Sequence, residues 1–242
     1  MIRLCSVSKT LGRGRFKKSV LEGVNWVIPD CGRFVILGQR GAGKSTLLHL
    51  ISGVVIPTDG WIERRGTISV AGGLLKYGRF GSARQLIHRL AAIYQVEARQ
   101  ADVFVGGLAE LGGLMDVPIR HLPRSLKKKL NIALTYAFPF DVYLFDGSIN
   151  FGDSPDIKAR IKGVHDMRTR HASVIVATSS TAFAREFSTG AIAGILHKRK
   201  LLFFQEFEEA IAVFQDLPPP PKPDFVSHFD EEEVPEVDDL AF

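Results

Sequence analysis

Short apolar segments recur along the chain between stretches whose apolar residues are spaced as in helices. Four of these segments are rich in β-branched residues and are predicted to be strands: Arg33 to Leu37, Val142 to Phe145, Val174 to Ala177, and Ala191 to Leu196. Strands that alternate with helices in this way are typical of an α/β fold with a mostly parallel central sheet. Two N-terminal stretches, Ile2 to Val7 and Val20 to Ile28, are instead predicted to be antiparallel edge strands.

Two longer stretches, Ser82 to Tyr94 and Ser125 to Phe138, have helical apolar spacing, and the region between them is also expected to be helical. They predict a helical subdomain of about residues 78–138 within one domain of residues 1–215. Prolines then cluster at 218–223 and are followed by an acidic run, a composition that cannot bury enough apolar surface to offset the entropy of ordering. Residues 216–242 are therefore predicted to form a flexible tail.

Composition narrows the class of protein further. The chain is 45% hydrophobic, which excludes disorder of the whole chain, yet no segment approaches the roughly 20 apolar residues of a membrane span. Cys5 and Cys31 lie far apart and have no metal-ligand spacing, which favours reduced thiols in a cytosolic protein. The last 19 residues hold eight Asp and Glu and no Lys or Arg, so residues 1–223 carry a net charge of +13, eight above that of the whole chain.

The clearest motif is a phosphate-binding loop at residues 38–45, which reads Gly-Gln-Arg-Gly-Ala-Gly-Lys-Ser. A predicted strand leads into it, and a helix from Thr46 to Ile51, stopped by Gly53, leads out. Glycine has no Cβ atom, so successive backbone N–H groups can surround phosphate oxygens, and the helix N-terminus adds a favourable dipole. The residues predicted to contact a nucleotide are Gly38, Gln39, Arg40, Gly41, Ala42, Gly43, Lys44, Ser45 and Thr46.

The same motif assigns roles to individual side chains. Lys44 is predicted to contact the β- and γ-phosphates of ATP, and the Ser45 hydroxyl to hold Mg²⁺. An apolar strand that begins at Asp141 ends in Asp146, and a carboxylate at the end of such a strand holds the metal in P-loop enzymes. Ser45 and Asp146 are therefore the predicted metal-side residues, with ATP and Mg²⁺ as cofactors.

These segments together resemble the ATP-binding subunits of ABC transporters, and most closely those that export capsular polysaccharide or O-antigen. The resemblance runs from residue 1 to about residue 215. It is carried by the loop and its helix with the following Val54 to Gly60, by Phe140 to Asp146, and by Gly152-Asp153, which resembles the family's D-loop. The closest similarity is Leu201 to Ile211, which resembles the strand and short helix that end the domain in these exporters.

The resemblance implies an ABC-type fold and a peripheral location on the cytoplasmic face of the inner membrane. Its implied partners are a membrane permease and a second ATPase subunit, in a homodimer or a heterodimer. ATP would be bound between the P-loop of one subunit and the signature motif of the other. Nucleic acid is not an expected partner, because soluble ABC proteins of that kind usually carry two ATPase domains in one chain.

Several positions depart from the family pattern. Where the signature normally reads close to Leu-Ser-Gly-Gly-Gln, this chain has Leu-Pro-Arg-Ser-Leu, so Pro123 replaces the serine and Ser125 replaces a glycine. The glutamate expected after the metal-side aspartate is Gly147, which has no side chain to act as a base. Ser179 stands where a histidine is expected near the γ-phosphate. No residue is therefore assigned as catalytic.

Two further family residues have no clear counterpart in this sequence. An aromatic residue that stacks on adenine is expected near Leu11, and Phe16 is a candidate for this role. The Q-loop glutamine cannot be assigned between Ser69 and Ser82, because the nearby Gln85 is expected within a helix.

Two functions therefore stay open at the level of sequence. The first is an ATP-binding subunit of a polysaccharide exporter with impaired ATP hydrolysis. The second is a nucleotide-binding pseudo-ATPase with a regulatory or scaffolding role, paired with an intact ATPase or engaging another protein through the acidic tail. Copurification with a permease and the turnover of ATP would separate them.

Overall fold

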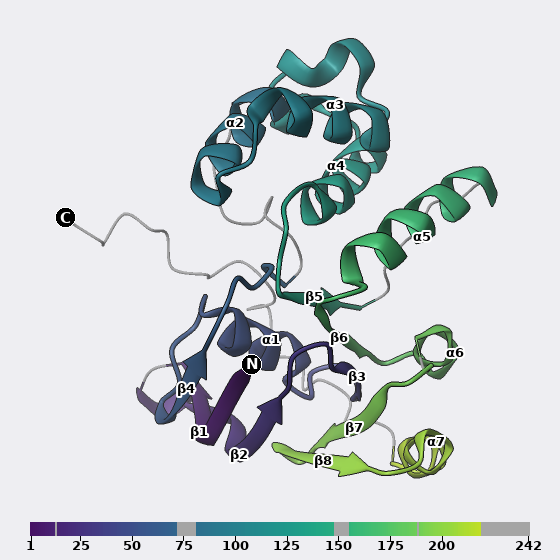
Figure 1. Ribbon diagram of the computed structural model, residues 1–242. Coiled ribbons are helices and arrows are strands. Elements are labelled where there is room, and N and C mark those ends of the chain that lie inside the picture. The colour runs from purple at the N-terminus through teal and green to yellow at the C-terminus, as the bar shows by residue number, and fades with distance from the viewer. Residues whose placement is uncertain (13, 72–80, 148–154, 188, 219–242) are drawn as a thin grey trace.

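The computed structural model describes residues 1–12, 14–71, 81–147, 155–187 and 189–218. They form two β-sheets with helices packed around them and a separate group of helices, as Figure 1 shows. Within these residues, no helix has both the length and the apolar character needed to cross a membrane. Cys5 and Cys31 are both free, as expected from the sequence.

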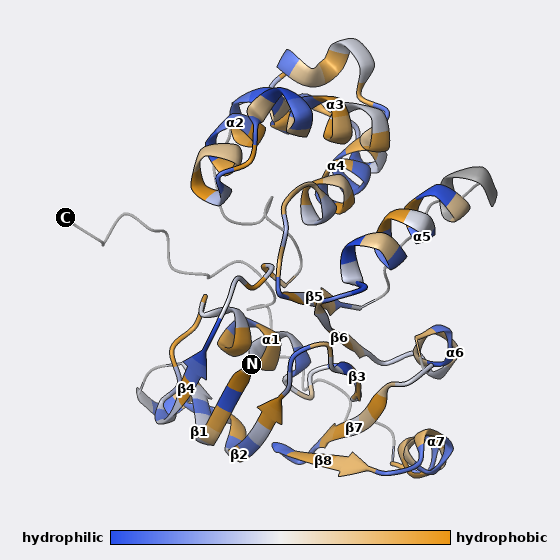
Figure 2. Ribbon diagram, viewed as in Figure 1, coloured by the Kyte–Doolittle hydropathy of each residue, from blue (hydrophilic) through white to orange (hydrophobic). Residues whose placement is uncertain are grey.

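The first sheet is antiparallel and has the strand order β2-β1-β4, formed by β1 (Ile2–Leu11), β2 (Lys18–Ile28) and β4 (Asp59–Arg64). Along β1 the colours of Figure 2 change between hydrophobic and hydrophilic, and Ile2, Leu4 and Val7 are its buried residues. Both predicted strands are antiparallel as expected, and β2 lies at a sheet edge, but the prediction of an edge position is wrong for β1, which pairs with β2 on one side and β4 on the other. Strand β4 was not predicted, because it lies at the sheet edge and its mostly polar residues lack an apolar pattern.

The second sheet contains the four strands that were predicted to form a parallel sheet. Its order is β5-β6-β3-β7-β8, with bounds β3 (Arg33–Leu37), β5 (Val142–Asp146), β6 (Ser173–Thr178), β7 (Ile192–His197) and β8 (Lys200–Phe204). The first four strands pair in parallel, and β8 joins β7 antiparallel. Every residue of β6 is buried, as expected for a parallel strand covered on both faces. The predicted α/β fold is confirmed.

Three helices pack against the second sheet and form apolar cores with its strands. Helix α1 (Lys44–Ser52) ends at Gly53, as predicted, and its residues Leu47 and Leu48 share one apolar core with residues of both sheets. Two helices later in the chain, α6 (Thr181–Glu186) and α7 (Phe207–Gln215), contribute to a second core with β3 and β7. The strand and short helix expected near residues 201–211 are β8 and α7.

The remaining helices form the group at the top of Figure 1: α2 (Ala83–Tyr94), α3 (Ala98–Ala109) and α4 (Arg124–Ala137), with short 3-10 turns at Gly112–Asp116 and Ile119–His121. Helix α5 (Pro155–Thr169) lies beside α4. Gln85 is a helical residue, as expected, and forms a capping box with Ser82 at the start of α2.

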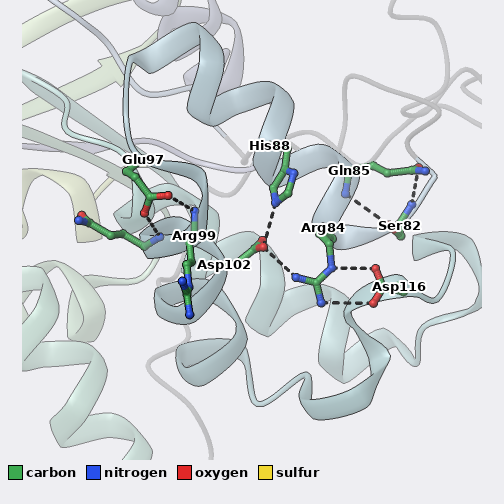
Figure 3. A network of polar contacts seen from close by, with 9 residues as sticks. Ser82, Arg84, Gln85, His88, Glu97, Arg99, Asp102 and Asp116 are labelled. Carbon is green, nitrogen blue, oxygen red and sulfur yellow. Dashed lines mark hydrogen bonds and ion pairs between the residues drawn. The ribbon is translucent and has the colours of Figure 1, made fainter.

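A shared carboxylate fixes α2 against α3 within this group (Figure 3). The Oδ2 atom of Asp102 accepts a hydrogen bond from Arg84 at 2.8 Å and lies 2.9 Å from Nε2 of His88. Arg84 also donates to Asp116, which follows α3 in the chain. The helices are therefore joined by polar contacts as well as by their apolar core.

Candidate nucleotide-binding site

The carboxyl ends of three parallel strands meet at one edge of the second sheet. Leu37 of β3 pairs with Thr178 of β6, and Asp146 of β5 pairs with Ala177 of β6. The ladder continues beyond the strands, since Gly38 N–H donates to the Thr178 carbonyl at 3.2 Å and Gly147 N–H donates to the Ala177 carbonyl at 2.8 Å. This pairing brings the predicted P-loop, Asp146, Gly147 and Ser179 to the same edge.

The P-loop between β3 and α1 has a backbone that requires glycine. Gly41 and Gly43 have φ of 77° and 101°, a left-handed conformation that residues other than glycine rarely adopt. A Cβ atom on Gly43 would lie 2.6 Å from Cγ1 of Val20, and one on Gly38 would lie 3.1 Å from the Leu196 carbonyl oxygen. The loop is therefore held by close packing, and Val20 is a site-forming residue that the sequence gave no motif for.

The Lys44 side chain folds back across this loop. Its Nζ atom donates to the carbonyl oxygens of Gly38 at 2.7 Å and Gln39 at 3.0 Å. Burial lowers the pKa of the Lys44 ammonium from its ordinary value, and the negative charge of Asp146 acts in the opposite direction. The cation and the predicted metal-side carboxylate are thus close enough to interact.

The N-terminus of α1 offers backbone donors to an anion. Gly43 is its N-cap and has no side chain to cap the helix, while the first intrahelical bond runs from Leu47 N–H to the Gly43 carbonyl at 2.9 Å. The N–H groups of Lys44, Ser45 and Thr46 therefore precede the hydrogen-bonded part of the helix. Together with the Lys44 cation they fit a chain of phosphates, and the exposed Ser45 hydroxyl and the Asp146 carboxylate are oxygen ligands of the kind that Mg²⁺ prefers.

Gly147 and Ser179, the positions where a glutamate and a histidine were expected from the family resemblance, follow the strands next to this cradle. Gly147 has φ of 81°, and an added Cβ atom would meet nothing within 4 Å, so backbone conformation rather than space disfavours a side chain there. Ser179 is exposed between β6 and α6, where the neighbouring Ser180 caps α6 by accepting from Phe183 N–H at 3.2 Å. The predicted D-loop, Gly152-Asp153, and most of the segment searched for a Q-loop glutamine lie outside the described residues.

The segment in the place of the family signature begins helix α4. Leu122 is buried, and Pro123 is the N-cap residue, whose carbonyl accepts from Lys127 N–H at 3.0 Å. Arg124 and Ser125 follow as exposed residues of the first turn. The segment thus presents backbone N–H groups at a helix N-terminus and a guanidinium, but no serine hydroxyl at position 123.

Phe16 lies in the connection between β1 and β2, within the 3-10 turn Gly14–Phe16. Its ring is 74% exposed, and the Arg15 guanidinium lies over it at 5.1 Å from the ring centroid. Strand β2 then reaches Val20, which packs against Gly43 of the P-loop. An exposed aromatic ring therefore lies four residues from a direct contact with the loop.

Strand β3, the glycine-rich loop and helix α1 surround Lys44, and Asp146 lies on β5, which is separated from β3 in the sheet by β6. Together these elements define a P-loop nucleotide-binding fold. The family model for the ABC transporter matches residues 21–149, which is more than half of the chain. The chain therefore belongs to the ABC transporter family, as its sequence motifs indicated.

Relatives with assigned names agree with this family. The chain is 30% identical to the capsule polysaccharide export ATP-binding protein CtrD of Neisseria meningitidis over 221 residues, which cover 90% of this chain and 100% of that protein. It is 31% identical to the polysialic acid transport ATP-binding protein KpsT of Escherichia coli, over 79% of this chain and 87% of that protein. Among solved structures, the dimeric ATP-binding cassette MJ0796 bound to ADP and Pi has a TM-score of 0.68, at 19% identity over 86% of this chain and 100% of that one.

A pair of alanine substitutions tests the packing of the P-loop. Gly41→Ala adds a Cβ atom, which meets nothing within 4 Å, to a backbone that is already left-handed, and we expect it to cost about 1 kcal/mol of unfolding free energy. Gly43→Ala adds a contact with Val20, and we expect a total cost of about 2–4 kcal/mol. Chemical denaturation of both variants measures the difference. Equal losses in the two variants would show that Val20 does not confine the loop.

Proposed function

We propose that this chain is the ATP-binding subunit of an ABC transporter that exports polysaccharide, bound to a permease at the cytoplasmic face of the inner membrane. The similarity to exporters such as CtrD and KpsT supports the substrate class. We propose further that the chain binds Mg-ATP but, as a homodimer, hydrolyses it poorly or not at all. This second part rests on one observation: the P-loop and Lys44 are in place to hold phosphates, but the neighbouring position of the expected base is Gly147, which has no side chain.

Binding would use groups that the fold holds in place. The N–H groups from Gly41 to Thr46 and the Lys44 ammonium would hold the phosphates, with Gln39 and Arg40 at the outer side of the loop. Ser45 and Asp146 would hold Mg²⁺, which neutralises phosphate charge when it is bound. Phe16 would contact adenine with its exposed ring.

Hydrolysis would be slow for a separate reason. A positioned general base typically contributes about 10² to 10⁴ in rate, equivalent to roughly 3 to 5 kcal/mol of barrier. Gly147 supplies no such group, Ser179 is not a histidine, and Pro123 offers no hydroxyl to the nucleotide of a partner subunit. The N-terminus of α4 keeps its backbone donors, so this loss removes catalytic groups more than it removes attraction for phosphate.

A heterodimer with an intact ATPase would make the two nucleotide sites unequal. The site on the P-loop of this chain would lack its own base, whereas the site on the partner's P-loop would keep the partner's base and face Pro123. Only the site on the partner's P-loop would then hydrolyse ATP. The pseudo-ATPase alternative is favoured by the same positions, Gly147 and Pro123, and differs in that no transport would depend on this chain's own site. In both, residues 1–215 would form the nucleotide-binding domain and residues 216–242 its tail.

Replacing the glycine at the base position tests the reason for slow hydrolysis. We expect Gly147→Glu to leave ATP turnover within about threefold of the wild type, because the left-handed backbone at φ 81° disfavours a side chain and misplaces its carboxylate. Gly147→Ala is the matched control, with the same backbone strain and no carboxylate. A rise of tenfold or more in the glutamate variant alone would support the missing base as the cause of slow hydrolysis, and it would contradict the claim that the backbone misplaces the carboxylate.

Copurification from the native host tests the proposed assembly. We expect affinity purification of the tagged chain in detergent to recover a membrane-spanning permease and a second ATPase whose signature and base are intact. Mass spectrometry of the recovered complex identifies both partners. A permease bound to two copies of this chain alone would exclude the heterodimer, and recovery of no membrane protein would favour the pseudo-ATPase.

A further inference from the structure

Exposed basic residues lie in the P-loop and in two neighbouring hairpins that contact it. Lys17 and Lys18 lie where β2 begins, Arg40 lies in the loop itself, and Lys198 and Lys200 lie at the turn between β7 and β8. We name these five residues the basic rim. Within the part of the chain that the structure describes, none of the five is in an ion pair, whereas the neighbouring Arg199 pairs with Glu22 at 3.2 Å.

Contacts between the three segments place them beside one another. Val20, close behind Lys18, packs against Gly43, and the Leu196 carbonyl of β7 closes the space at Gly38. Glu22 N–H of β2 donates to the carbonyl of Arg199 in the β7–β8 turn at 3.0 Å. The two hairpins therefore flank the P-loop, and their lysines add positive charge next to the loop that carries Lys44.

The end of the described chain returns to the same place. After α7, Leu217 packs on the core formed with β3 and β7. The carbonyl of the next residue, Pro218, accepts a hydrogen bond from Nε2 of Gln39, the second residue of the P-loop. The remaining 24 residues of the sequence therefore start at the nucleotide site, and residues 224–242 contain eight Asp and Glu with no Lys or Arg.

We propose that the acidic segment 224–242 binds the basic rim and competes there with the phosphates of the nucleotide. The inference rests on the proposed binding of ATP at the P-loop. Charge complementarity and the tether at Pro218 favour this segment over an untethered anion, because a covalent connection raises the effective concentration of the acidic residues at the site.

A full-length variant with a neutral tail tests the competition. The eight acidic residues of 224–242 are replaced by Asn or Gln, and the Kd for Mg-ATP is measured by titration calorimetry. We expect the neutral-tail variant to bind Mg-ATP about three- to tenfold more tightly than the wild type at low ionic strength, with little difference at high salt. Equal affinities at low salt would overturn the proposal.

A second measurement tests binding without using ATP as the readout. A fluorescent peptide of residues 219–242 is titrated with the neutral-tail variant, and its anisotropy reports binding. We expect Lys200→Glu to weaken binding of the peptide. Lys128→Glu, which makes the same charge change at an exposed position of α4, should leave peptide binding unaffected. ATP should displace the peptide, and a peptide with neutral side chains should not bind.

These two measurements separate the inference from the proposed function. If the variant binds Mg-ATP but not the peptide, the tail does not occupy the rim and the proposed function stands. If it binds the peptide but not Mg-ATP, the proposed function fails. Peptide binding that ATP does not displace, or that Lys128→Glu weakens as much as Lys200→Glu does, would show general attraction to a basic protein and overturn the proposed competition.

Discussion

Parallel pairing of β5, β6 and β3 brings the P-loop, Asp146, Gly147 and Ser179 to one edge of the sheet. The strand ends are in register, so the hydrogen bonds of Gly38 and Gly147 to carbonyls of β6 continue the ladder into the loops that follow. The P-loop, the metal-side carboxylate and the position of the expected base are consequently fixed by backbone contacts within one sheet. Helix α1 packs into the apolar core between the two sheets and keeps its N-terminus at this edge.

This constraint separates the binding of a nucleotide from its hydrolysis. Phosphate would be held largely by backbone N–H groups and one lysine, all positioned by the strand, the loop and the helix. In the proposed function, hydrolysis would depend on side chains that a change of sequence can remove without disturbing the sheet, and the positions proposed to have changed are Gly147, Ser179 and Pro123. Gly147 differs from the other two, because its left-handed backbone disfavours the missing side chain as well.

The sequence was sufficient where a single physical signal dominated. Buried parallel strands are continuous apolar runs, and the P-loop needs glycine and lysine at fixed spacing, so both were predicted in place. Strand β4 was missed because an exposed edge strand such as Asp59–Arg64 has no apolar periodicity. Three features arise from tertiary structure and are not predicted by any local sequence pattern. They are the packing of Val20 on Gly43, the left-handed backbone of Gly147 and the contact of Gln39 with Pro218. The roles assigned to the P-loop residues and Asp146 stay predictions, although the structure brings those residues together.

The central claim is that this chain binds Mg-ATP without turning it over on its own. Equilibrium binding and steady-state hydrolysis, measured on one purified sample of the wild type and on Lys44→Ala, test it most directly. The account predicts saturable binding in the wild type that Lys44→Ala abolishes, with wild-type hydrolysis no faster than in that variant. Hydrolysis by the wild type at about 1 s⁻¹ or faster, abolished by Lys44→Ala, would contradict the account and show that another residue supplies the base.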